Sequence, residues 1–253
     1  MSRIEKLVFS NEHEQQLSAR LDMPDGEPRA YALLAHCFTC NKSLKAAGHI
    51  AKGLVGQGIA VFRFDFTGLG ESEGDFSNTN FTSNVQDILS AANFMEQQGY
   101  APHILLGHSL GGTAVLKAAN FITSVKAVVT IASPASPAHV AEQFSDSKAI
   151  IAQQGEALVE LAGRDFIIKQ QFIDDLEQAA VLDDVAKLKK ALLVMHAPLD
   201  ETVGIENAAI IFQTAHHPKS YISLDQADHL LSQVSDACYV GQLIATWAER
   251  YLN

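Results

Sequence analysis

The sequence predicts an α/β protein in which helices flank a mostly parallel sheet. Short apolar runs alternate with amphipathic helical segments along most of the chain. The runs at residues 30–35, 59–66 and 127–132 are apolar nearly throughout, as expected of strands that are covered on both faces. Each of these runs ends in a polar or glycine-rich loop. Because the carboxyl ends of parallel strands meet at one edge of a sheet, we expect ligands to bind among these loops.

Length and composition exclude several classes of protein. The chain has 253 residues, of which 47% are hydrophobic and 19% charged, as in one large globular α/β domain. A net charge of −11 argues against nucleic acid or an anionic membrane as the main partner. The N-terminus has no signal-peptide pattern, no run reaches the ~18 apolar residues of a membrane helix, and three cysteines do not make a secreted disulfide framework. We expect a cytoplasmic protein without a cofactor or a metal.

The first half of the chain predicts a regular series of strands and helices. Residues 4–10 and 16–23 form two strands, and the second alternates polar with apolar residues, which is typical of an edge with one wet face. The elements that follow are strands at 30–35 and 59–66 and helices at 44–57 and 82–98, the last carrying Val85, Ile88, Leu89, Ala92 and Met95 at helical spacing.

The second half contains one connection that is too long for a simple crossover. More than fifty residues separate the strand at 127–132 from the strand at 191–196, so this segment must hold structure of its own. We predict a small cap at approximately 134–188, inserted into one domain that spans 1–253. Its expected elements are a helix at 138–154, a hairpin at 158–168 centred on Ala162, Gly163 and Arg164, and a helix at 170–188.

Phe144, Phe166, Ile168 and Phe172 in this cap either line an acyl or aryl pocket or form the cap's own core. Beyond the cap, we expect a helix at 204–215, a strand at 220–224 and a final helix with an apolar stripe of Val240, Leu243, Ile244, Trp247 and Tyr251.

The stretch at 103–112 is the centre of the functional interpretation. An apolar run at 104–106 stops at Gly107-His108-Ser109-Leu110-Gly111, which is a G-x-S-x-G pattern, and a helical segment at 113–120 follows. A strand, a sharp turn and a helix are the context in which this pattern forms a nucleophile elbow. The turn would strain the backbone of Ser109 and expose its hydroxyl above the sheet edge. We therefore predict Ser109 as a nucleophile.

A serine nucleophile needs a base and a carboxylate that orients the base. In this topology the order along the chain is Ser, then Asp or Glu, then His. Asp200 follows the strand at 191–196, and His229 follows the strand at 220–224, so both lie in loops that can converge on Ser109. Glu201 or Asp184 could replace Asp200, and His36 is the main rival to His229.

Acyl transfer also needs hydrogen-bond donors for the developing oxyanion. One donor is the backbone N–H after the nucleophile, that of Leu110, and the other comes from the loop after the third strand. In that loop, His36 to Cys40, we predict the N–H of Phe38, with the side chain of Thr39 as the second choice. Loss of one such donor costs on the order of 10²–10³ in kcat.

These motifs resemble the α/β-hydrolase superfamily over nearly the whole chain. The residues that carry the resemblance are His36-x-Phe38-Thr39, Asp65-x-x-Gly68-x-Gly70-x-Ser72, Gly107 to Gly112, Asp200-x-x-Val203 and Asp228-His229. The segments at 36–40, 64–70 and 197–205 resemble the hydrolase half of fusions with an OsmC-like domain, whose relatives include cinnamoyl/feruloyl-type esterases. The resemblance implies an α/β-hydrolase fold with a sheet of about eight strands whose second strand is antiparallel.

One departure from the family pattern concerns the oxyanion loop. The usual loop is His-Gly-x-x-Gly, and here Cys37 and Cys40 replace both glycines, which restricts the backbone where a positive φ could be needed. The C-x-x-C spacing leaves two interpretations. The favoured one is a pair of small, buried, reduced thiols, and the other is a redox pair that gates the oxyanion loop. A metal site lacks a second pair of ligands.

The glycine-rich segment at 65–72 could suggest a phosphate loop, but it lacks the G-K-[ST] ending, so we expect it to brace the active-site loops. We predict a serine hydrolase, and first a carboxylic ester hydrolase that works through an acyl-enzyme on a small or aryl ester. A peptidase, amidase or thioesterase would use the same triad. A binding module that partners an OsmC-like protein, and a homodimer, stay open.

Overall fold

The computed structural model describes residues 3–161 and 163–252. Met1, Ser2 and Asn253 lie outside these residues, as does Ala162, where the hairpin of the cap is predicted to turn. The core is an eight-stranded sheet in the order β1-β2-β4-β3-β5-β6-β9-β10. β2 pairs antiparallel with both β1 and β4, while the pairs from β4 to β10 are parallel. The implied sheet with an antiparallel second strand is thereby confirmed.

The strands fall within a few residues of their predicted bounds. They are β1 (Arg3–Ser10), β2 (Gln16–Met23), β3 (Ala30–Ala35), β4 (Ile59–Phe64), β5 (Ile104–His108), β6 (Ala127–Ile131), β9 (Ala191–His196) and β10 (Lys219–Ser223). The strands β4, β5, β6 and β9 are buried at every residue, because helices cover both of their faces.

Two helices cover one face of the sheet. α1 (Lys45–Val55) and α8 (Val234–Leu252) pack on each other and on the apolar side chains that β3, β5 and β6 direct to that face. The approach of the two helices is close, since a Cβ on Gly241 would lie 2.4 Å from the carbonyl oxygen of Ile50. The predicted stripe on α8 takes part in this core, and Trp247 Nε1 donates a hydrogen bond to Ser220 Oγ over 3.0 Å.

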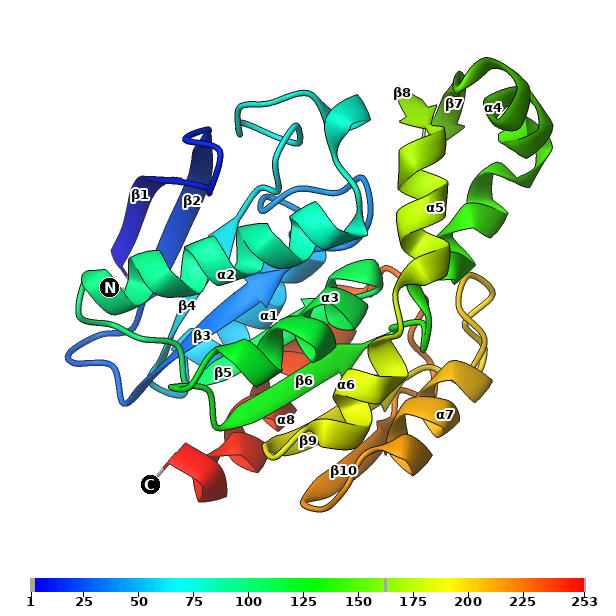
Figure 1. Cartoon of the computed structure of the whole chain (residues 1–253). Helices are drawn as coiled ribbons and strands as arrows, with labels where there is room; N and C mark the ends of the chain where they lie inside the picture. Colours follow the sequence, from blue (N-terminus) through cyan, green and yellow to red (C-terminus); the bar gives the residue numbers. More distant parts are fainter. Residues whose placement is uncertain (1–2, 162, 253) are drawn as a thin grey trace.

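The opposite face carries the second and larger apolar core. Its helices are α2 (Phe81–Gln97), α3 (Leu110–Ala118), α6 (Val181–Lys187) and α7 (Glu206–Thr214), with the short 3₁₀ helices η1 (Phe76–Asn78) and η2 (Ala119–Phe121) beside them. α2 begins at a capping box, in which Asn80 and Ser83 exchange side-chain and backbone hydrogen bonds. Figure 1 shows the sheet between these two helical layers.

Most of the segment between β6 and β9, from η3 (Pro137–Ser147) to α5 (Gln170–Gln178), stands beyond the carboxyl ends of the strands, whereas its last helix α6 lies against the sheet (Figure 1). The segment contains η3, α4 (Lys148–Gln154), the antiparallel hairpin of β7 (Glu156–Leu161) and β8 (Arg164–Lys169), α5 and α6. The hairpin forms as predicted. The expectation of a continuous helix at 138–154 was wrong, because residues up to 147 are 3₁₀ and Phe144 leaves helical geometry to reach the cap's core. The helix expected at 170–188 is broken at Ala179 and Ala180.

The described helices include none that is long and apolar enough to cross a bilayer.

The contact between α1 and α8 gives a test of the fold. Gly241→Val would place a branched side chain against the backbone of Ile50, and we expect it to lower the free energy of unfolding by about 2–3 kcal/mol. Urea denaturation followed by circular dichroism measures this change. Gln242→Ala, at the next and exposed position of α8, is the matched control and should change stability by less than about 0.5 kcal/mol. Equal stabilities of the two variants would contradict the close packing.

Candidate active site

Ser109 occupies a strained turn between β5 and α3. Its backbone has φ 54° and ψ −127°, a conformation that non-glycine residues rarely adopt. Two glycines permit the turn, because a Cβ on Gly107 would lie 2.3 Å from the carbonyl oxygen of Gly111. A Cβ on Gly111 would lie 2.3 Å from that of His36. The elbow expected from the sequence is therefore present, and α3 begins at Leu110, three residues earlier than predicted.

Asp200, His229 and Ser109 form a continuous chain of hydrogen bonds. His229 Nδ1 lies 2.8 Å from Asp200 Oδ2, and His229 Nε2 lies 3.1 Å from Ser109 Oγ. A carboxylate accepts hydrogen bonds, so Nδ1 carries the proton and Nε2 is free to accept the serine proton. The structure thus brings together the three residues that the sequence proposes. The other candidates lie elsewhere, since Asp184 faces Lys117 at 3.7 Å and Glu201 is exposed.

The environment of Asp200 keeps its carboxylate ionised. Burial raises the pKa of Asp200, but hydrogen bonds from His229 and from the N–H groups of Val203 and Thr202 outweigh it, so the pKa lies below its usual value. Asp200 Oδ1 accepts both backbone hydrogen bonds at 2.9 Å. A carboxylate held in this way fixes the orientation and tautomer of His229.

Two backbone N–H groups are available beside Ser109. Within residues 3–161 and 163–252, no hydrogen-bond acceptor faces the N–H of Phe38 or that of Leu110. Leu110 opens α3, where the first N–H groups have no partner within the helix. Both residues border the same small apolar hollow next to the elbow. These N–H groups are the donors that the sequence proposes for an oxyanion.

The oxyanion loop is closed by a disulfide between Cys37 and Cys40. The favoured expectation of two reduced thiols is therefore wrong for this structure, while gating by the pair stays a prediction. The turn is also held by a hydrogen bond from the N–H of Cys40 to the carbonyl of Cys37. A positive φ of 58° falls on Thr39, between the cysteines, so neither replacement of glycine is itself in the left-handed region.

His36 supports this loop from inside the protein. Its Nε2 accepts a hydrogen bond from the N–H of Phe66, and its Nδ1 donates to the carbonyl of Cys37 over 2.8 Å. Burial lowers the pKa of His36 to about 4, so the ring is neutral and can serve both partners. His36 is thereby engaged in bracing the loop.

The segment at 65–72 braces the same region through a buried ionic cluster. Asp65 accepts hydrogen bonds from the backbone N–H and the side chain of Lys42 and from the N–H of Glu71. Lys42 also pairs with Glu71 at 2.7 Å. Gly70, with φ 57°, leaves room for the Asp65 carboxylate, which a Cβ would meet at 2.2 Å. The expectation of a structural brace is confirmed.

Two further histidines, which the sequence analysis gave no role, position the loops of the site. His108, the variable residue of the elbow, donates from Nε2 to the backbone carbonyl of His229 over 2.7 Å. His196, at the end of β9, donates from Nε2 to the carbonyl of Val203 over 2.8 Å. The sequence feature that could have indicated this role is a histidine at the carboxyl end of a buried strand, from which the ring reaches a neighbouring loop.

The aromatic side chains of the cap form its core. Phe144, Ile168 and Phe172 are buried, and Phe172 packs between Phe144 and Phe38, with ring centroids 6.3 and 5.6 Å apart. A cavity opens at Ser109 between the loops of the site and the cap. Among the described residues, none of the cap aromatics lines it. Of the two interpretations left open by the sequence, the structure favours a cap core.

Residues 26–162 match the family model described as serine aminopeptidase, S33 (Hydrolase_4). The chain belongs to this hydrolase family. The S33 family assignment agrees with the α/β-hydrolase sheet and with the position of the elbow in it.

The similarity to solved structures extends over nearly the whole chain. The esterase domain of a Rhodothermus marinus protein is 47% identical, with 99% of this chain and 100% of that chain covered and a TM-score of 0.81. Est1E of Butyrivibrio proteoclasticus, solved with ferulic acid bound, shares the fold at 20% identity and a TM-score of 0.79, covering 97% and 99% of the two chains. Mouse mitochondrial palmitoyl-protein thioesterase ABHD10 is 26% identical over 74% of this chain and 66% of its own length.

The buried histidines make stability depend on pH. Burial lowers the pKa of His36 and of His108 from 6.5 to about 4. The folded protein therefore binds fewer protons than the unfolded chain in this window, and the stabilisation present above pH 6.5 is lost as the pH falls towards about 4. Asp87 acts in the opposite direction, because burial raises its pKa from 3.8 to about 6. The stabilisation of the folded state that Asp87 gives at low pH is therefore lost as the pH rises through about 6.

The pKa shifts of the two histidines together exceed the opposite shift of Asp87. We therefore expect the free energy of unfolding to decrease by about 3 kcal/mol on acidification through this window. Urea titrations at successive pH values measure the slope. His108→Gln, which keeps a side-chain donor for the carbonyl of His229, should make the slope shallower, whereas His13→Gln at an exposed position should leave it unchanged. A slope that His108→Gln does not alter would refute this account.

Proposed function

We propose that the chain is a serine carboxylesterase that works through an acyl-enzyme. The observation that carries the proposal is the chain of hydrogen bonds from Asp200 through His229 to Ser109. An ester carbonyl bound beside Ser109 is attacked by Oγ while His229 Nε2 accepts the serine proton. The N–H groups of Phe38 and Leu110 stabilise the oxyanion of the tetrahedral intermediate.

The second half of the reaction returns the enzyme to its starting state. As the intermediate collapses, the bond to the leaving oxygen breaks and His229 gives its proton to the departing alcohol. Water then attacks the acyl-enzyme, with His229 again accepting a proton and later returning it to Ser109. Asp200 keeps the ring of His229 in place throughout and stays ionised.

The esterase domain at 47% identity favours ester substrates. An aminopeptidase must bind the α-ammonium group of its substrate, usually with a carboxylate, and the side chains that line the cavity at Ser109 include no Asp or Glu within the described residues. We therefore place ester hydrolysis before peptide hydrolysis. A thioester uses the same triad, and the similarity to palmitoyl-protein thioesterase ABHD10 makes it the second candidate substrate.

An OsmC-like partner stays a separate proposal, which co-purification with a purified OsmC-like protein would test.

Ser109→Ala removes the attacking oxygen, and we expect the kcat for p-nitrophenyl acetate to fall on the order of 10⁴-fold or more. A stopped assay with p-nitrophenol detection measures the loss, and circular dichroism checks the fold. A fluorophosphonate probe should label the native chain and not the variant. Ser145→Ala, at an exposed position of the cap, is the control that keeps full activity. Undiminished activity of Ser109→Ala would rule out the mechanism.

The disulfide gives a second test of the site. Reduction of Cys37 and Cys40 removes the covalent restraint on the loop that presents the N–H of Phe38, and we expect kcat to fall about tenfold with a smaller change in KM. Assays before and after treatment with dithiothreitol measure the change. The double variant Cys37→Ser/Cys40→Ser should have the lower activity with and without reductant, whereas Cys238→Ser, which removes the free cysteine, should respond like the native chain. Equal activity of the oxidised and reduced native chain would disprove gating by this pair.

A further inference from the structure

The cavity at Ser109 is large. Its volume is about 920 Å³, and it is lined by two of the three catalytic candidates, Ser109 and His229, by the predicted oxyanion loop, by the start of α1 and by the cap. A cavity of this size holds more than a small acyl group and alcohol. Its lining therefore carries information about the remainder of the substrate.

The formal charges on the lining all have one sign. Lys45 from α1 and Arg164 from the cap hairpin are the Lys and Arg side chains of the lining, and Asp or Glu side chains are absent from it among the described residues. The whole chain carries 29 acidic and 18 basic residues, so a purely basic lining runs against its composition. The charged side chains of the lining therefore favour a negatively charged ligand.

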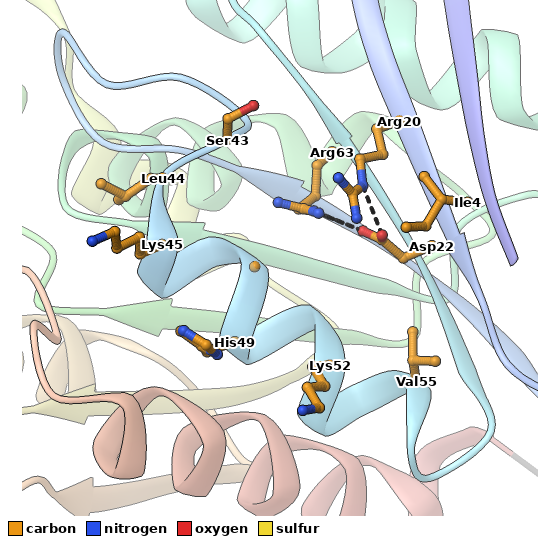
Figure 2. A pocket seen from close by; sticks show the side chains of 11 residues that line it. Ile4, Arg20, Asp22, Ser43, Leu44, Lys45, His49, Lys52, Val55 and Arg63 are labelled. Atoms are coloured by element: carbon orange, nitrogen blue, oxygen red, sulfur yellow. Dashed lines mark hydrogen bonds and ion pairs between the residues drawn. The ribbon is translucent and has the colours of Figure 1, made fainter. Parts of the chain in front are cut away.

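Lys45 is free to bind a ligand. Its side chain is exposed and, in the part of the chain that the structure describes, forms no hydrogen bond or ion pair. His49, one turn further along α1, also borders the cavity and is likewise unpartnered among those residues. Figure 2 shows Lys45 and His49 on the side of α1 away from the ion pair of Asp22 and Arg63. Lys45 and His49 also border the hollow that Asp22 lines, but Asp22 pairs with Arg20 and Arg63 and not with either of them.

Arg164 faces the cavity from the cap and keeps donors to spare. It donates from one terminal nitrogen to the carbonyl of Thr39 in the oxyanion loop, and its guanidinium lies over the ring of Phe166 at 5.2 Å. A guanidinium has five N–H donors, so the contact with Thr39 leaves others for a ligand. The two contacts also fix the guanidinium, which lowers the entropic cost of binding an anion.

We propose that the substrate carries a carboxylate in addition to the ester, and that Lys45 and Arg164 bind this carboxylate while Ser109 attacks the ester. The inference rests on the proposed esterase function and assigns its substrate class. His49 lines the same cavity and can add a hydrogen-bond donor. The carboxylate can belong to the acyl chain or to the leaving alcohol.

The test compares pairs of esters in which a second carboxyl group is either free and ionised or masked as its methyl ester. For the acyl side, the pair is mono-p-nitrophenyl suberate and its methyl ester. For the alcohol side, the pair is meta-carboxyphenyl butyrate and its methyl ester. We expect kcat/KM to be higher for the acid than for the methyl ester in one of the pairs, by about five- to tenfold at low salt, and the preference to shrink at high salt.

Variants then assign the preference to residues. Lys45→Gln and Arg164→Gln should each reduce the ratio of acid to methyl ester about threefold. Because Arg164 also holds Thr39, its variant is judged by this ratio and not by absolute activity. Lys52→Gln is the matched control, since Lys52 lies further along α1 and borders the neighbouring hollow of about 420 Å³ instead of the cavity at Ser109 (Figure 2). It should keep the native ratio.

Two results would overturn the inference. One is that the native protein hydrolyses the methyl esters as well as the acids, or better, in both pairs. The other is that neither Lys45→Gln nor Arg164→Gln changes the ratio. In both cases turnover of the neutral esters and labelling of Ser109 by fluorophosphonate would leave the esterase proposal intact. Absence of both turnover and labelling would instead refute the esterase function itself.

Discussion

The site depends on one close contact between two backbones. Gly111, in the first turn of α3, lies so near the end of β3 that a Cβ would approach the carbonyl oxygens of Ala35 and His36 within 2.6 and 2.3 Å. This contact sets the nucleophile elbow directly against the start of the oxyanion loop. The strained backbone of Ser109 is the consequence, because the chain must reverse within a single residue to bring α3 there.

The loops around this contact are held together by buried histidines. His36, His108 and His196 each donate a ring N–H to a backbone carbonyl, of Cys37, His229 and Val203 respectively. Burial keeps the rings of His36 and His108 uncharged, so these two satisfy a carbonyl without the desolvation cost of an ion. Together with the cluster of Asp65, Lys42 and Glu71, these rings fix loops from β3, β4, β5, β9 and β10 relative to one another.

Much of this arrangement could be read from the sequence. The apolar runs predicted the strands because burial on both faces of a parallel sheet demands uninterrupted apolar residues, as at 30–35 and 191–196. Ser109, Asp200 and His229 could be named because each follows such a run, and the topology places the ends of these strands at one edge. Features that depend on contacts between distant parts of the chain could not be predicted from the sequence. Phe144 leaves helical geometry to join the cap core, and His108 and His196 take partners that are distant along the chain.

The disulfide changes what the oxyanion loop can do with its side chains. A loop of the His-Gly-x-x-Gly type obtains its shape from the conformational freedom of glycine, whereas here a short covalent ring limits the shapes that Phe38 and Thr39 can adopt. Within that ring a bulky residue is tolerated, and Phe38 packs on Phe76 and Phe172 with centroids 5.9 and 5.6 Å apart. Phe38, whose N–H we propose as an oxyanion donor, thus also belongs to the aromatic core on which the cap packs. Changes in the cap's packing can therefore alter the rate of chemistry without touching the substrate.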